Sequence, residues 1–213
     1  GDPVQWRFWI GSRNLTGSRD LDAGLLVTSS HDKAARLVPD IAELARGLLV
    51  EGQFTATELN ELRTARWLAP AGTAIRRLLW RRPGGDTSFI SAPLLGGAET
   101  ASAVSPFIDV TGLREVLRAG APSVTLLTND VSAGSCAPIS GIVFRTGAAA
   151  EPETTVSVDQ QTDDRTAEFI EPLPAGVHAK MIAVSKGKRS AIMLGSANLT
   201  KRGLLGPNAE AVA

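Results

Sequence analysis

The chain has 213 residues, of which 43% are hydrophobic and 21% are charged. These values are ordinary for a globular protein with a real core. Its 22 basic and 22 acidic residues balance, which excludes a generally basic nucleic-acid coat but allows a local basic groove. No apolar stretch of about 18 residues predicts a membrane span, and the first residues predict no secretory signal. The single cysteine, Cys136, predicts a structural thiol in a reducing, cytoplasmic compartment.

Hydrophobic patterning predicts strands and helices in mixed order along the chain, which is typical of an α/β fold. Thr57 is the expected N-cap of the second helix, and the polar segment 146–176 is expected to be mostly loop. The expected helices are 31–49 (interrupted at Pro39), 57–68, 72–82 and 110–120. The expected strands are 6–10, 24–28, 88–95, 101–109, 123–128, 141–146, 154–158, 178–185 and 189–195, with a further strand at the end of the chain.

The sequence Gly-Ser-x-Asn-Leu-Thr occurs twice, at residues 11–16 and 195–200, each time after a hydrophobic strand. An acidic residue follows each copy, Asp22 after the first and Glu210 after the second. The first copy is four residues shorter between the motif and this acid. The repeat predicts two related halves, 1–100 with a helical insertion and 101–213.

A His-x-Lys pair, His178 and Lys180, precedes the second copy but not the first. His31-Asp32-Lys33 has the same spacing but follows the first motif, and we expect it to be a surface helix start. Trp6 and Trp9, near the first motif, are expected in the core rather than as platforms for nucleic-acid bases. The arginines at 76, 77, 81 and 82 are expected on a solvated helix face.

His178-x-Lys180 followed by Gly195-Ser196-x-Asn198 resembles the phospholipase D superfamily, and "GSANLTKRGL" resembles its nuclease- and helicase-associated members. The resemblance covers both ends of the chain. It implies a pseudo-twofold fold in which two half-repeats, with mixed sheets flanked by helices, share one phosphodiesterase site. It also implies that neither a metal nor a cofactor is needed.

The residue types suit this chemistry. Imidazole is nucleophilic near neutral pH, so His178 is expected to attack phosphorus and form a phosphohistidine. Lys180, Ser196 and Asn198 would hold the phosphate oxygens, and Glu210 would orient the imidazole. In the first half, the expected phosphate-binding residues are Ser12, Asn14 and Asp22. Flanking phosphates are expected at Lys186, Lys188, Lys201 and Arg202.

Two features depart from the family pattern. The aspartate expected five residues after the lysine is Ser185 here, which we interpret as a missing supporting residue. Counting back from Gly11 by the 17 residues that separate His178 from Gly195 places a first His-x-Lys before residue 1. Either the chain is a fragment of a longer protein, or two copies pair their His178 side chains in a homodimer.

Three functions remain open at this stage. The first is a metal-independent nuclease that cleaves DNA, within a larger protein or a defence or helicase-type assembly with a motor domain. The second is a non-catalytic module that binds nucleic acid or phosphate. The third is a phospholipase D-type enzyme acting on lipid, which would need an apolar entrance that the sequence does not show.

Overall fold

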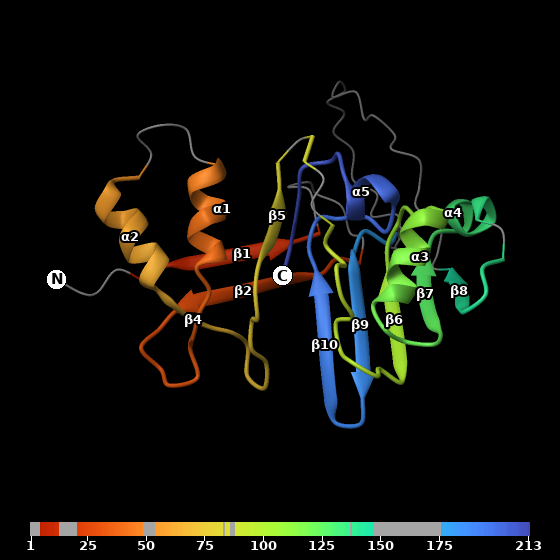
Figure 1. Ribbon diagram of the computed structural model, residues 1–213, viewed down its shortest axis with the longest axis horizontal. Helices are drawn as coiled ribbons and strands as arrows, with labels where there is room; N and C mark the ends of the chain where they lie inside the picture. Colours follow the sequence, from red (N-terminus) through yellow and green to blue (C-terminus); the bar gives the residue numbers. More distant parts are fainter. Residues whose placement is uncertain are drawn as a thin grey trace, which may run out of the picture.

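The computed structural model describes residues 5–12, 21–48, 54–82, 84–85, 88–136, 138–146 and 176–213. These residues form a mixed α/β structure with three sheets and five short helices. A smaller sheet with two helices lies on one side, and a five-stranded sheet with three helices lies on the other (Figure 1). The expected α/β class is therefore confirmed. No helix in these ranges is long and apolar enough to cross a bilayer.

The smaller sheet is entirely antiparallel. Its inner face carries Ile10, Val27 and Trp67, which pack in one buried cluster with Ile41 and Leu62 from the two helices. Its strand order is β1 (Arg7–Gly11), β2 (Gly24–Ser29), β4 (Arg66–Leu68) and β3 (Arg36–Leu37). The helices that cover it are α1 (Asp40–Leu48) and α2 (Ala56–Thr64).

The larger sheet combines a β-hairpin with a parallel unit. The hairpin strands β10 and β9 are antiparallel, β9 also pairs antiparallel with β6, and β6, β7 and β8 are parallel. Its strand order is β10 (Arg189–Leu194), β9 (Met181–Lys186), β6 (Thr100–Val104), β7 (Val124–Thr128) and β8 (Ile142–Thr146). The accompanying helices are α3 (Val110–Arg118), α4 (Asp130–Ser135) and α5 (Lys201–Leu205).

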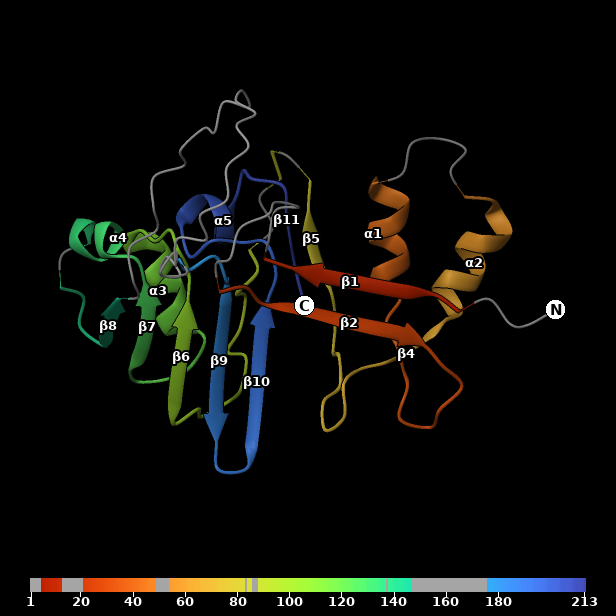
Figure 2. The ribbon, with the colours of Figure 1, turned by 180° about the vertical axis from the view of Figure 1, so that it is seen from behind.

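A two-stranded sheet joins the two larger ones. Strand β5 (Leu79–Arg81) pairs antiparallel with β11 (Glu210–Val212), the last strand of the chain. Figure 2 shows this pair between the two larger sheets. A further bridge connects Gly195, just after β10, to Val212, so β11 contacts the end of the five-stranded sheet. The second Gly-Ser motif therefore lies where the two parts of the molecule meet.

Helix α3 and the second motif approach each other closely. Asp109 caps α3 by accepting a hydrogen bond from the Gly112 N–H at 2.7 Å, and its other oxygen accepts from the Lys201 N–H at 2.8 Å. A Cβ on Gly112 would lie 2.0 Å from the carbonyl oxygen of Leu199. Only glycine fits there, so α3 can support the loop that carries Asn198.

Most of the predicted strands are confirmed, including those of β1, β2 and the β9–β10 hairpin. Helix 110–120 is confirmed as α3 and the terminal strand as β11. Helices α4 and α5 were not predicted, because runs of six and five residues carry too little periodicity. The predicted strand at 154–158 lies outside the described residues.

The helix predictions in the first half were partly wrong. In the segment 31–49, the helix begins only after Pro39, and the residues before it form turns and the short strand β3. Helix α2 is capped by Thr55, not Thr57: the Thr55 hydroxyl accepts from the Glu58 N–H, and the Glu58 carboxylate accepts from the Thr55 N–H. The helix ends at Thr64 because residues 66–68 pair with two other strands.

Two further segments differ from expectation. Residues 72–82 contain no helix, and their end forms strand β5 because it pairs with β11, a partner 129 residues away in the Arg81–Glu210 pair. Residues 88–95 form bends and irregular backbone instead of a strand, although Phe89, Ile90 and Leu95 are buried in the main core. Cys136 is buried, as expected of a structural thiol.

Candidate phosphodiester site

The first motif ends strand β1 and pairs with the residues that precede β2. The Ser12 N–H donates to the carbonyl oxygen of Ala23 at 2.9 Å, and the Ala23 N–H donates to the Ser12 hydroxyl oxygen at 3.1 Å. The Ser12 hydroxyl in turn donates to the Asp22 carboxylate. Ser12 is buried, so this serine and carboxylate are held in one orientation. Asn14, predicted as a third member, lies outside the described residues.

The second motif makes the same set of hydrogen bonds. The Ser196 N–H donates to the carbonyl oxygen of Ala211 at 3.0 Å, the Ala211 N–H donates to the Ser196 hydroxyl oxygen at 3.0 Å, and that hydroxyl donates to Glu210 at 2.5 Å. The four additional residues of the second copy lie between the motif and Glu210. The two copies therefore share a local structure as well as a sequence.

His178 and Lys180 lie against the first motif. The segment before β9 bridges to Leu21, whose carbonyl oxygen accepts from the His178 and Ala179 N–H groups at 2.9 and 2.8 Å. The Lys180 ammonium donates to the carbonyl oxygen of Ser12 at 3.1 Å. The pair thus lies just before β9, not within one long strand as predicted, and it connects the two halves of the sequence.

Lys180 is a buried cation, with 6% of its surface exposed. Its ammonium also donates to the His178 carbonyl oxygen at 2.8 Å and lies 3.4 Å from the imidazole Nδ1. Burial lowers the pKa of Lys180 from its ordinary value, and the carboxylates of Asp22 and Glu210 partly oppose that change. Both carboxylates therefore act on one ammonium group, one from each copy of the motif.

Among the residues that the structure describes, the carboxylate nearest the imidazole belongs to Asp22. His178 Nδ1 lies 3.9 Å from Asp22 Oδ1, whereas no hydrogen bond or ion pair joins His178 to Glu210 in the described structure. Asp22, and not the expected Glu210, is therefore the carboxylate within 4 Å of the His178 ring in the described structure. Sequence alone did not indicate this, because the carboxylate comes from the other motif copy, 156 residues away.

Asn198 occupies the loop between β10 and α5. The Ser105 hydroxyl lies 3.4 Å from the Asn198 side-chain oxygen and accepts from the Leu199 N–H at 3.1 Å. Ser105 follows β6 and is completely buried. Its position at a parallel strand end was the available sequence signal, but the residue was not predicted as part of the site.

Arg81 is a second residue that sequence analysis placed wrongly. It was expected on a solvated helix face, but it is 3% exposed and pairs across strands with Glu210. Burial lowers the pKa of Arg81, and Glu210 partly opposes this. The guanidinium donates to the carbonyl oxygens of Arg202, Gly203, Leu204 and Asn208. It thereby fixes the segment that leads from α5 to Glu210.

The predicted basic contacts do not form one group. Lys201 and Arg202 are exposed at the start of α5, close in sequence to Asn198. Lys186 and Lys188 lie at the β9–β10 turn, at the opposite end of a six-residue strand from Lys180, a separation of roughly 20 Å. Ser185 is also remote, and its hydroxyl lies 3.0 Å from that of Ser190 across the hairpin.

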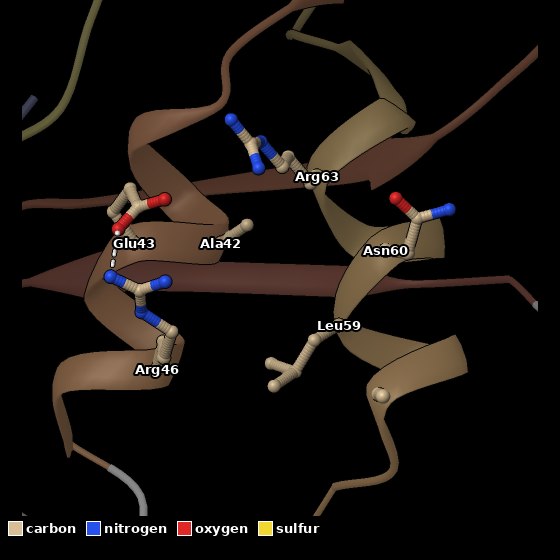
Figure 3. Close-up of a pocket in the computed structure, with 7 residues that line it drawn as sticks. Ala42, Glu43, Arg46, Leu59, Asn60 and Arg63 are labelled. Carbon is tan, nitrogen blue, oxygen red and sulfur yellow. Dashed lines mark ion pairs between the residues drawn. The ribbon is translucent and has the colours of Figure 1, made fainter.

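A separate groove lies between α1 and α2, lined by Ala42, Glu43, Arg46, Ala56, Leu59, Asn60 and Arg63 (Figure 3). Arg46 and Glu43 form an ion pair of 3.3 Å within it. It contains none of the motif residues and is therefore separate from the candidate site. No group of three or more His, Cys, Asp or Glu side chains that could hold a metal ion lies in the described ranges.

No protein-family model matches the chain, and no curated protein matches it in sequence.

Proposed function

We propose that the chain is a phospholipase D-like phosphodiesterase that cleaves DNA through a phosphohistidine, with its two motif copies forming a pseudo-twofold site. The observation that carries this proposal is the contact between His178-x-Lys180 of one half and Ser12 and Asp22 of the other. A nucleophile, a cation and two serine–carboxylate pairs converge there, and such convergence supports phosphoryl chemistry.

In the proposed reaction, His178 attacks phosphorus through Nε2, because both contacts of the ring within the described structure involve Nδ1. The new N–P bond replaces the bond to the leaving oxygen, which takes up a proton. Water then breaks the N–P bond and restores the imidazole. Lys180 stabilises the charge on the phosphoryl oxygens, and Asp22 orients the ring.

The first half-site has no His-x-Lys of its own in this sequence. Strand β1 has a partner on only one edge within the described sheet, whereas the matching strand β10 pairs with β9, which directly follows Lys180. A His-x-Lys strand added along β1 would place a second imidazole near Glu210, where it could protonate the leaving oxygen. Strand β9 already pairs on both edges, so a homodimer would have to bring the partner's imidazole to this site by a contact other than strand pairing along β1.

The testing experiment is a DNA cleavage assay in excess EDTA at low and moderate salt. We expect His178→Ala to abolish cleavage, and His31→Ala to leave it unchanged because His31 is exposed and outside the site. Cleavage should fall steeply with salt, since phosphate contacts release counterions. Equal activity of the two variants would overturn the assignment. DNA binding without cleavage by the parent protein would favour the non-catalytic module.

A further inference from the structure

Trp9 lies on the outer face of the β1–β2 hairpin, not in the core as predicted. Its surface is 53% exposed, and its cross-strand partner is Leu26, which is also 53% exposed. The buried residues Ile10 and Val27 belong to the opposite face, which α1 and α2 cover. The outer face therefore presents an exposed aromatic ring to solvent.

Two glycines determine where the indole lies. A Cβ on Gly11 would come within 2.2 Å of the Trp9 ring, and a Cβ on Gly24 would come within 3.1 Å of it. These glycines face each other across the hairpin, so the ring lies across both strands in the space that their side chains would occupy. Resting on this backbone, the ring is held in place and keeps a surface open to solvent.

This position is next to the candidate site. Gly11 directly precedes Ser12, and Gly24 follows Asp22 by two residues, which is about 7 Å along an extended chain. Asp22 is the carboxylate nearest His178. A group stacked on Trp9 would therefore lie beside the phosphate that His178 is proposed to attack.

The same face also carries positive charge. Arg7 lies two positions before Trp9 on β1, so its side chain projects from the same face of the strand. It is exposed and forms no ion pair with any described residue. An aromatic ring alternating with an unpaired cation suits a nucleic-acid strand, whose bases stack while its phosphates meet the cation.

Building on the proposed function, we infer that the Trp9 indole is the stacking platform for an unpaired base next to the scissile phosphate, so that the substrate is single-stranded or locally unpaired DNA. Arg7 contacts a phosphate further along the same strand. A base in a duplex has both faces covered by its neighbours, so it must leave the stack to use this platform.

The test measures binding in a His178→Ala background, so that the DNA stays intact. The probes are fluorescent oligodeoxythymidine and an abasic oligonucleotide of equal length, which keeps the phosphates but has no bases. Trp9→Ala should weaken oligodeoxythymidine binding about ten-fold and leave abasic binding unchanged. Trp9→Phe should retain most of the affinity, and Leu26→Ala, on the same face, should bind both probes normally.

Other outcomes overturn the inference. Equal loss on both probes would assign Trp9 to hairpin structure, and an equal effect of Leu26→Ala would indicate a general apolar docking face. Concentration-dependent dimerisation that Trp9→Ala abolishes would assign the face to a second copy. Hydrolysis of bis(p-nitrophenyl) phosphate by the protein with His178 intact tests the proposed function separately. If this hydrolysis depends on His178 while Trp9 has no effect on DNA binding, only the inference fails.

Discussion

The Lys180 ammonium lies 3.1 Å from the carbonyl oxygen of Ser12, 168 positions earlier in the chain. This contact joins the two copies of the motif, because Ser12 belongs to the first copy and Lys180 precedes the second. It also explains why Lys180 is buried. The proposed chemistry depends on this junction, and so do the first two predictions.

Asp22→Asn should reduce turnover of a phosphodiester by about a hundred-fold or more, because an amide can present the imidazole with the wrong tautomer. Asp32→Asn, an exposed aspartate outside the motif, is the control and should keep normal turnover. Single-turnover kinetics measure both variants. Normal turnover by Asp22→Asn would show that the 3.9 Å approach to His178 has no part in catalysis.

Lys180 should set an alkaline limit on activity. Because burial lowers its pKa from 10.5, the Lys180 ammonium should be lost, and kcat should fall, beginning below pH 10.5. The free energy of unfolding should change in the opposite direction. Charging this buried group costs stability. The contribution of Lys180 to the free energy of unfolding is therefore largest above pH 10.5 and is lost as the pH falls through the lowered pKa.

The Lys180 prediction is checked with pH profiles of kcat and of urea unfolding, each compared with Lys180→Met. The wild type should gain stability relative to the variant as the pH rises toward 10.5. The effect of burial would be contradicted if the stability profiles of the wild type and Lys180→Met ran parallel and kcat fell only at or above pH 10.5.

Arg81→Leu should lower the free energy of unfolding by about 3 kcal/mol, because buried carbonyl oxygens of the α5–β11 segment would lose their donor. The neighbouring Arg82 is exposed, and its guanidinium lies 5.3 Å from the centroid of the Trp80 ring. Arg82→Leu should therefore cost no more than about 1 kcal/mol. Denaturant unfolding compares the two, and equal losses would refute the role assigned to Arg81.

Gly112→Ala should destabilise the protein by about 3 kcal/mol or more, since the new methyl group would overlap the Leu199 carbonyl and displace α3 from the Asn198 loop. Gly134→Ala in α4 is the matched control. No atom lies within 4 Å of a Cβ there, and alanine is the better helix former by about 0.5 to 1 kcal/mol. Thermal unfolding should therefore separate the two variants in opposite directions.

The sequence predicted what local pattern determines. Hydrophobic runs at 24–28 and 189–195 predicted strands that form, and the serines of the repeated Gly-Ser motif, Ser12 and Ser196, each donate to a carboxylate. It could not predict features that depend on distant partners. Residues 79–81 form a strand only against 210–212, and that pairing also buries Arg81 while leaving Arg82 exposed.

The candidate site also combines features that are local in the sequence with features that depend on distant partners. The serine–carboxylate pairs are close in sequence and follow from the repeat. The approach of Asp22 to His178 requires the two halves to meet, which no local pattern specifies. Trp9 was assigned to the core because large aromatic residues are usually buried there, whereas glycines on both hairpin strands hold it on the surface.

The most direct test of the central claim is acid-free trapping of the enzyme during turnover of a DNA oligonucleotide, followed by peptide mass spectrometry. The account predicts a DNA fragment joined through its phosphate to the peptide that contains His178, formed in the presence of EDTA and absent from His178→Ala. Efficient cleavage with no covalent adduct, or an adduct on another residue, would contradict it.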